Sequence, residues 1–260
     1  MSSNAARIFV IGGHGKVALH FTRLASQAGH TVISQIRNAS HSSDLPNPGP
    51  GKVEPLVENL EDLNVSQLAK LFKDQNPNVI IFAAGAGGKG GAERTFAVDR
   101  DGAIKVFDAL EQANLPSSQF KRFLLVSAID SRNVETTKPD WYTEKDFERS
   151  KKAREALGTY YQAKYEADLN LSKRNSFPWF VLRPSTLQDE PAGGVSLAEH
   201  STIANPVPRE SVAKVLLALA ELPADAKGAN GQMWNLTSGK GDVHDQVQAA
   251  VKRARTDWVG

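Results

Sequence analysis

Cysteine is absent from this chain of 260 residues. Its absence excludes disulfide bonds, a thiol nucleophile and zinc sites with cysteine ligands. An excess of either charge is also missing, since 31 Lys and Arg residues against 29 Asp and Glu residues give a net charge of +2. That near-balance argues against a nucleic-acid partner. Apolar runs are short and none approaches the roughly 18 residues of a membrane span, so we expect no membrane partner.

Targeting signals and metal-ligand patterns are missing as well. Residues 1–7 hold no basic segment followed by an apolar stretch, so we expect no secretory signal and a soluble, cytoplasmic protein. The six histidines show no ligand spacing, and we therefore predict no metal site. Hydrophobic residues make up 40% of the chain, which is enough for a globular core. The surface patterns do not distinguish a monomer from a homodimer.

Short apolar runs alternate with helical patterns along the chain, which indicates an α/β protein with a parallel sheet built from βαβ units. We find no internal repeat and no linker that divides two cores, so we predict one domain over residues 1–260. The expected strands are residues 7–11, 31–36, 53–60, 79–84, 123–128, 179–182 and 233–236, and the expected helices are residues 16–28, 65–74, 96–113, 160–173, 209–222 and 243–255.

A glycine loop separates the first expected strand from the first helix, in the pattern Gly12-x-x-Gly15-x-x-Ala18. Gly12 permits a sharp turn, Gly15 lets the backbone approach a diphosphate, and the helix N-terminus offers N–H groups to it. The alternative is a tight turn with no ligand. Lys16 either pairs with a cofactor phosphate or is solvated. The predicted cofactor-binding residues of this loop are Gly12, Gly13, His14, Gly15, Lys16 and Val17.

The end of the second strand bears on the choice between the two nicotinamide cofactors. An acidic residue there binds the ribose 2′-hydroxyl of NAD, whereas a basic residue neutralises the 2′-phosphate of NADP. Arg37 follows the strand, and no acid occurs before Asp44. The planar guanidinium suits a phosphate, so we predict NADP as the cofactor. The alternative is an ordinary surface arginine.

A candidate catalytic group lies further along the chain. Tyr160 and Lys164 stand four residues apart, on one face of the expected helix. An ammonium near a tyrosine favours its phenolate, which makes the tyrosine a better acid or base near neutral pH. Ser127 ends a buried strand, where its hydroxyl could hold a substrate carbonyl oxygen. The alternative is an isolated helix pair, and Tyr161, which lacks a lysine four residues on, is expected to pack.

Several other features admit two readings. The glycine-dense stretch 85–91 either lines the cofactor or is a surface loop. Trp141, Tyr142 and Phe147, in the charged stretch 131–157, either cover a substrate or anchor this segment to the body. Arg183 either reaches a ligand or is structural. Residues 185–205 carry turn formers and little periodicity, and we expect them to form the specificity loop.

Taken together, these motifs resemble the short-chain dehydrogenase/reductase family, and more closely its atypical, NmrA-like, NAD(P)-binding branch. The resemblance covers nearly the whole chain. It implies a Rossmann-like, doubly wound parallel sheet with an irregular C-terminal substrate-binding segment, in which about residues 131–158 and 184–208 shape the pocket. It further implies that Asn59, Leu60, Ala83, Ala84 and Gly85 contact the cofactor.

The same resemblance assigns roles to the candidate catalytic residues and implies a small-molecule substrate. Tyr160 would act as acid or base, and Lys164 would bind the nicotinamide ribose. Ser127 would occupy the third active-site position of the family. Asp99 stands where catalytically complete members carry asparagine, and it is either functional or a helix-surface acid. We therefore expect an NADP-dependent oxidoreductase acting on a small carbonyl or hydroxyl compound. The alternatives are a dinucleotide-binding sensor or regulator without turnover, and a non-redox epimerase or dehydratase.

Overall fold

The computed structural model describes residues 5–88, 90–200 and 202–260. Its main sheet has the strand order β3-β2-β1-β4-β5-β6-β10-β8, and only the β10–β8 pair is antiparallel. The strands are β1 (Arg7–Ile11), β2 (Thr31–Ile36), β3 (Lys52–Val57), β4 (Val79–Phe82), β5 (Arg122–Val126), β6 (Trp179–Pro184), β8 (Val195–Leu197) and β10 (Gln232–Ser238). The chain changes direction across the sheet between β1 and β4, the point at which ligands bind in such folds.

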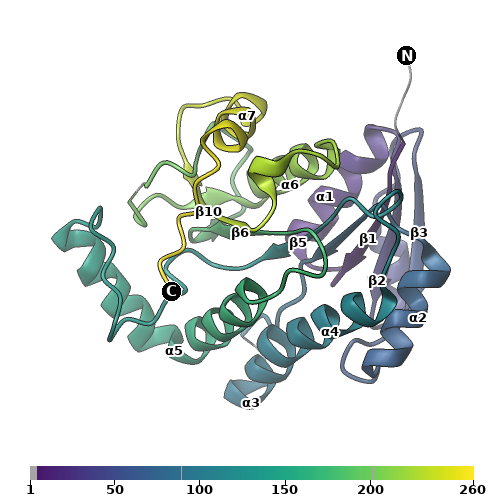
Figure 1. Cartoon of the computed structure of the whole chain (residues 1–260), viewed down its shortest axis with the longest axis horizontal. Helices are drawn as coiled ribbons and strands as arrows, with labels where there is room; N and C mark the ends of the chain where they lie inside the picture. Colours follow the sequence, from purple (N-terminus) through teal and green to yellow (C-terminus); the bar gives the residue numbers. More distant parts are fainter. Residues whose placement is uncertain (1–4, 89, 201) are drawn as a thin grey trace.

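Helices cover both faces of the sheet, which confirms the predicted Rossmann-like α/β fold (Figure 1). One face carries α1 (Lys16–Gln27), α6 (Arg209–Glu221) and α7 (Val243–Arg253). The other carries α2 (Val65–Gln75), α4 (Ala103–Ala113) and the second half of α5 (Glu144–Ser172). Shorter elements are η1 (Ala39–Asp44), α3 (Gly91–Thr95), η2 (Phe96–Gly102), η3 (Lys227–Ala229) and the pair β7 (Leu187–Gln188) and β9 (Val207–Pro208). Of the helices in the described ranges, none has the length and hydropathy needed to cross a membrane.

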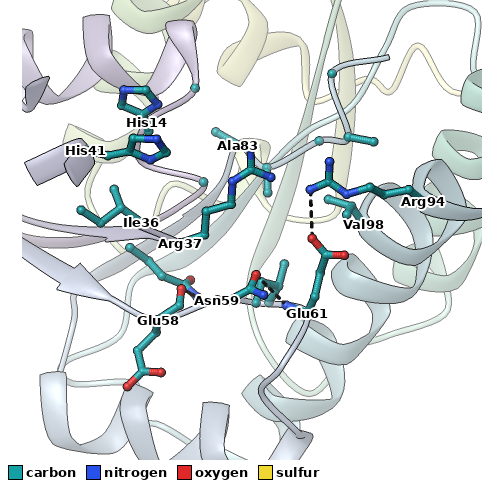
Figure 2. Close-up of a pocket in the computed structure, with 18 of the residues that line it drawn as sticks. His14, Ile36, Arg37, His41, Glu58, Asn59, Glu61, Ala83, Arg94 and Val98 are labelled. Atoms are coloured by element: carbon teal, nitrogen blue, oxygen red, sulfur yellow. Dashed lines mark hydrogen bonds and ion pairs between the residues drawn. The ribbon is translucent and has the colours of Figure 1, made fainter. Parts of the chain in front are cut away.

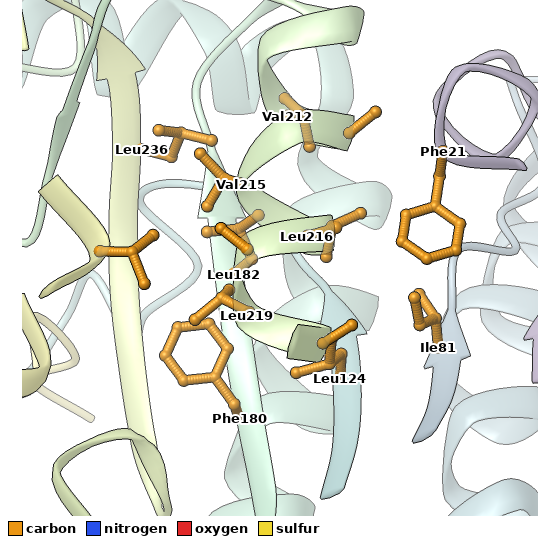
Figure 3. Close-up of a cluster of buried hydrophobic side chains, with 14 of the residues drawn as sticks. Phe21, Ile81, Leu124, Phe180, Leu182, Val212, Val215, Leu216, Leu219 and Leu236 are labelled. Carbon is orange, nitrogen blue, oxygen red and sulfur yellow. The ribbon is translucent and has the colours of Figure 1, made fainter. Parts of the chain in front are cut away.

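Apolar side chains from both strands and helices form the core between these layers. Figure 3 shows α6 packing against the sheet, where Val215 and Leu219 lie beside Phe180 and Leu182 of β6, and all four are fully buried. A strand covered by helices on both faces needs apolar residues at every position. This requirement explains why all four residues of β4 are buried.

The largest difference from the sequence-based expectation concerns α5. We expected a helix over residues 160–173, but α5 begins at Glu144, where Thr143 and Asp146 form a capping box. Its first half extends away from the sheet (Figure 1) and therefore shows no apolar periodicity. The helix is kinked at Leu157, whose backbone is non-helical. Beyond this kink, the second half packs on one face of the sheet through Ala167 and Leu171.

Two other segments also differ from expectation. The stretch that we read as irregular, residues 184–208, contains β7, β8 and β9, which are too short to show an alternating pattern. The expected helix 96–113 contains η2, a π-helical turn of seven residues, ahead of α4. π-Helical turns are rare and occur often at functional sites. Here the turn holds Asp99, which is only 2% exposed, so Asp99 is not the surface acid that we considered.

Candidate functional site

The glycine loop lies between β1 and α1, packed against two neighbouring loops. Gly12 has φ +82°, and a Cβ at this position would lie 2.6 Å from Cα of Ala84. The Gly13 N–H donates to the Gln35 carbonyl at 2.8 Å, and a Cβ on Gly13 would meet the Ser34 hydroxyl at 1.9 Å. Both positions therefore require glycine, as the turn argument for Gly12 predicted.

Gly15 ends this loop and is the N-cap of α1, without a side-chain hydrogen bond to the first turn. The N–H groups of that turn have no carbonyl partner within the helix, and the helix dipole makes this end positive. A Cβ on Gly15 would approach the Gly12 carbonyl to 3.2 Å. An uncapped helix end beside a surface kept free of side chains fits the diphosphate of a dinucleotide.

A first cavity of about 420 Å³ lies next to this loop, beyond the ends of β2 and β3 (Figure 2). Of the predicted cofactor residues, it brings together Gly12, His14, Gly15, Lys16, Arg37, Asn59, Leu60, Ala83, Ala84 and Gly85. Val17 lines the neighbouring cavity described below, whereas Gly13 lines neither, because it packs against Ser34 of β2. The Asn59 side chain stays within its own loop, where it donates to Asp62 at 3.0 Å.

Basic side chains surround this first cavity, and sequence reasoning found only part of them. Arg37 is exposed, and within the described residues it makes no hydrogen bond or ion pair with another residue. Figure 2 shows its guanidinium between the His14–His41 stack and Arg94. The two imidazole rings lie 3.8 Å apart, and Arg94 pairs with Glu61 at 3.0 Å. His41 and Arg94 come from segments without a motif, so no sequence signal indicated them.

A second cavity, of about 820 Å³, adjoins the first and shares with it Gly15, Lys16 and residues 83–87. Ser127, Tyr160 and Lys164 line its far side, together with residues 156–159 at the kink of α5. Part of the glycine-dense stretch 85–91 lines it too, although Lys89 lies outside the described residues. The structure thus places the three predicted catalytic residues in one cavity that continues into the predicted cofactor cavity.

Lys164 is buried and forms an ion pair with Asp99 of η2. The Nζ–Oδ1 distance is 3.0 Å, and Nζ also donates to the Val126 carbonyl at 3.2 Å. Burial acts to lower the pKa of Lys164, but Asp99 and Tyr160 outweigh it and the pKa lies above its ordinary value. Asp99 also accepts the Ala86 N–H at 2.9 Å, close to Gly85. Asp99 therefore holds both the lysine and the loop after β4.

Tyr160 is half-buried, and its ring centroid lies 5.7 Å from the Lys164 ammonium. We expected the lysine to favour the phenolate. Lys164 does lower the pKa of Tyr160, but burial raises it by more, and Asp99 and Asp168 raise it further. The pKa therefore lies above its usual value although the lysine acts in the expected direction. Tyr160 remains a protonated phenol throughout the neutral range.

Ser127 donates its hydroxyl hydrogen to Asp168 at 2.8 Å, and Ser131 donates to the same carboxylate oxygen at 2.6 Å. Asp168 is fully buried, and this burial raises its pKa although Arg183 and the two serines oppose the shift. Sequence reasoning missed Asp168. Its signal was the spacing of Tyr160, Lys164 and Asp168, each four residues from the next and hence on one face of α5.

The remaining candidates are structural. Arg183 is buried and donates to the carbonyls of Ala128, at 3.3 Å, and Ser131, at 2.9 Å, so it does not reach the cavity. Trp141 stacks on His200 with a ring separation of 3.9 Å. Tyr142 contacts both Trp141 and Phe147. Trp141 thus connects the segment 131–157 to His200, and none of the three aromatic residues lines the second cavity.

The segment 185–205, which we expected to determine specificity, reaches the second cavity only with residues 185–187. Ser201, in the same segment, lies outside the described residues. The kink of α5, at residues 156–159, forms more of the wall. No group of three or more metal-ligating side chains occurs in the part of the chain that the structure describes.

Comparison with known proteins agrees with this geometry. The model of an NAD(P)H-binding family matches residues 12–223. A UPF0659 protein of Schizosaccharomyces pombe is 42% identical over 215 residues, covering 82% of this chain and 84% of the relative. The uncharacterized sugar epimerase YhfK of Bacillus subtilis is 29% identical over 243 residues, covering 93% of this chain and 99% of that protein.

A solved structure from Bacillus halodurans, provisionally named an NAD-dependent epimerase/dehydratase, shares the fold. Its TM-score is 0.73 and its sequence identity 26%, and the match covers 94% of this chain and 100% of that chain.

Proposed function

The chain belongs to the NAD(P)H-binding family, and from this premise we propose that it is an NADP-dependent oxidoreductase that reduces a small carbonyl compound. The observation that carries the proposal is the continuity of the two cavities, because they share the edge formed by Gly15, Lys16 and residues 83–87. A dinucleotide whose diphosphate lies at this edge can extend to both sides. When bound, its nicotinamide ring supplies or accepts a hydride.

Arg37 supports NADP rather than NAD as the cofactor. Its guanidinium lines the first cavity and has no carboxylate partner within the described residues, so it is available to a 2′-phosphate. Glu58 and Glu61 line the same cavity, but Glu61 is paired with Arg94. Arg37 follows β2, the strand whose end meets the adenosine ribose in folds of this type.

Tyr160 supports reduction as the favoured direction. Because its pKa lies above the ordinary value, the phenol holds its proton at neutral pH and can donate it to a carbonyl oxygen as the carbonyl is reduced. Lys164 keeps a positive charge beside the ring. Ser127 takes a different role from the expected one, because its hydrogen is bonded to Asp168 and its oxygen is left to accept a hydrogen bond.

Epimerisation is the second candidate, and the similarity to YhfK favours it. A serine that accepts a hydrogen bond suits a substrate hydroxyl, which an epimerase that uses a nicotinamide would oxidise transiently and then reduce, with no net redox change. A sensor without turnover is the third candidate. It is favoured by Asp99, because this carboxylate pairs with the lysine that would otherwise assist Tyr160.

The test compares Tyr160→Phe with Tyr161→Phe. Both side chains line the second cavity, but Tyr161 has Tyr165 four residues on and a pKa raised by burial to about 12. With a panel of aldehydes and ketones and NADPH, we expect Tyr160→Phe to lower kcat/KM about 100-fold or more and Tyr161→Phe to lower it little. Equal rates for wild type and Tyr160→Phe would remove this residue from the chemistry.

Measuring cofactor consumption and product identity separates the candidates. A reductase consumes NADPH, whereas an epimerase interconverts two isomers without net consumption of the cofactor. A sensor does neither, while still binding the cofactor.

A further inference from the structure

Lys16 and Arg209 come from different parts of the chain and meet at one carboxylate. Lys16 begins α1, and its Nζ lies 2.5 Å from Oδ2 of Asp189. Arg209 begins α6, and its guanidinium lies 2.6 Å from Oδ1 of the same residue. Asp189 follows β7 in the segment that we read as irregular. A single carboxylate thus bridges two cations with its two oxygens.

The two cations line the second cavity, whereas Asp189 does not. Among the described residues that line this cavity, the charged ones are Lys16, Asp99, Lys164 and Arg209. Lys164 and Asp99 neutralise each other across 3.0 Å. With Asp189 counted beside them, Lys16 and Arg209 still carry an excess of one positive charge at the edge of the cavity. A positively charged edge favours a ligand that carries a negative charge.

The bridging carboxylate is held only weakly. Lys16 and Asp189 expose 66% and 57% of their side chains, and exposed ion pairs of this kind contribute little because solvent screens them. Arg209 is less exposed, at 22%, and faces the cavity. An incoming acid can therefore replace Asp189 on Arg209 at small cost, and Asp189 itself demonstrates that a carboxylate fits the pair.

The uncharged part of the wall is mixed. Its larger apolar residues include Val126, Ile129 and Leu187, together with Leu157 at the kink of α5, and its hydroxyl-bearing residues are Thr95, Ser127, Thr159, Tyr160, Tyr161, Ser185 and Thr186. The cavity therefore combines apolar and hydroxyl-bearing surface, a phenol that holds its proton, and a cationic edge.

We propose that Lys16 and Arg209 bind a carboxylate group of the substrate, displacing Asp189, so that the substrate is a carbonyl compound bearing an acid group. This proposal rests on the proposed function, in that the compound reacts beside Tyr160. It also accounts for Asp189, which then serves as the resident counter-ion of the two cations until substrate arrives.

The test uses benzoate as the probe and benzamide as its uncharged analogue. Both are titrated by saturation-transfer NMR into the protein with and without saturating NADPH, and NADPH binding is measured separately for every variant. We expect benzoate to bind about tenfold more tightly than benzamide. Arg209→Gln should abolish this difference, and Arg209→Lys, which keeps the charge, should restore most of it. Lys214→Gln removes one positive charge further along α6 and serves as the control.

Asp189→Asn gives the most specific result. Removing the resident carboxylate should tighten benzoate binding about threefold or more, whereas Glu190→Gln, which removes the same charge one residue further on, should not. Equal affinity for benzoate and benzamide, or no binding of either, would overturn the proposal. It would also be overturned if Arg209→Gln weakened NADPH binding and left benzoate unaffected, since the cations would then serve the diphosphate of the cofactor. Absence of NADPH binding in the wild type would count against the proposed function instead.

Discussion

The hydroxyl of Ser127 donates to the carboxylate of Asp168 across 2.8 Å, at the carboxyl end of β5. Asp168 lies one helical turn beyond Lys164 and two beyond Tyr160, so a single face of α5 carries all three residues. Ser131 donates to the same oxygen at 2.6 Å, and the Arg183 Nε lies 3.9 Å from it. This buried carboxylate thus fixes the direction in which Ser127 presents its oxygen to the cavity.

Removing this carboxylate should destabilise the protein. Asp168→Ala leaves two buried hydroxyls without their acceptor, and we expect the free energy of unfolding to fall by about 1–3 kcal/mol. Asp168→Asn keeps an acceptor of the same shape and should cost less. Urea unfolding measures both, with Glu155→Ala as the control because it is exposed on the same helix. An alanine variant as stable as wild type would show that the network does not hold the site.

The direction of the Tyr160 pKa shift predicts opposite pH dependences for the two directions of the reaction. Carbonyl reduction needs the protonated phenol, and because the pKa is raised we expect its rate to stay level between about pH 6 and 9. Alcohol oxidation needs the phenolate and should rise with pH throughout this range. Stopped-flow measurement of NADPH consumption and formation tests both. A reduction rate that falls steeply between pH 6 and 8 would contradict the shift.

Asp99→Asn should change both stability and the pH profile. It leaves the buried ammonium of Lys164 without its partner, which costs about 3 kcal/mol of unfolding free energy. It also removes a negative charge that raises the pKa of Tyr160, so the pH profile of alcohol oxidation should move to lower pH. Thermal unfolding and pH–rate profiles measure the two effects. Asp101→Asn, in the same π-helical turn but exposed and paired with Arg100, provides the comparison.

If Asp99→Asn left the pH profile where it is in wild type, Asp99 would have only a structural role. If it created activity in a protein that otherwise showed none, the sensor interpretation of the wild type would gain support.

Local patterns allowed much of the fold to be predicted from sequence. The apolar runs of β1 and β2, and the glycine loop that follows β1, can each be recognised from a few consecutive residues. The structure confirms both strands with the expected bounds. The same holds for the grouping of Tyr160 and Lys164, since four-residue spacing places two side chains on one helical face. Each of these signals depends only on neighbours in the chain.

Features that depend on distant contacts were not predictable in this way. The first half of α5 packs no continuous apolar face, so only its capping box at Thr143 and Asp146 marks where it begins. The effect of Lys164 on Tyr160 depends on Asp99, which comes from another helix. Likewise, the role of Ser127 depends on Asp168. The charge at the edge of the second cavity depends on Asp189, which lies in the segment that we read as irregular.

The first cavity, between the glycine loop and Arg37, should bind a phosphorylated dinucleotide. Isothermal titration calorimetry with NADPH and NADH, on wild type and Arg37→Gln, tests it most directly. We expect the wild type to bind NADPH at least about tenfold more tightly than NADH, because one charge-assisted phosphate contact contributes about 1.5–3 kcal/mol. Arg37→Gln should remove that preference while NADH binding persists. If the wild-type protein bound neither nucleotide, the central claim would be wrong.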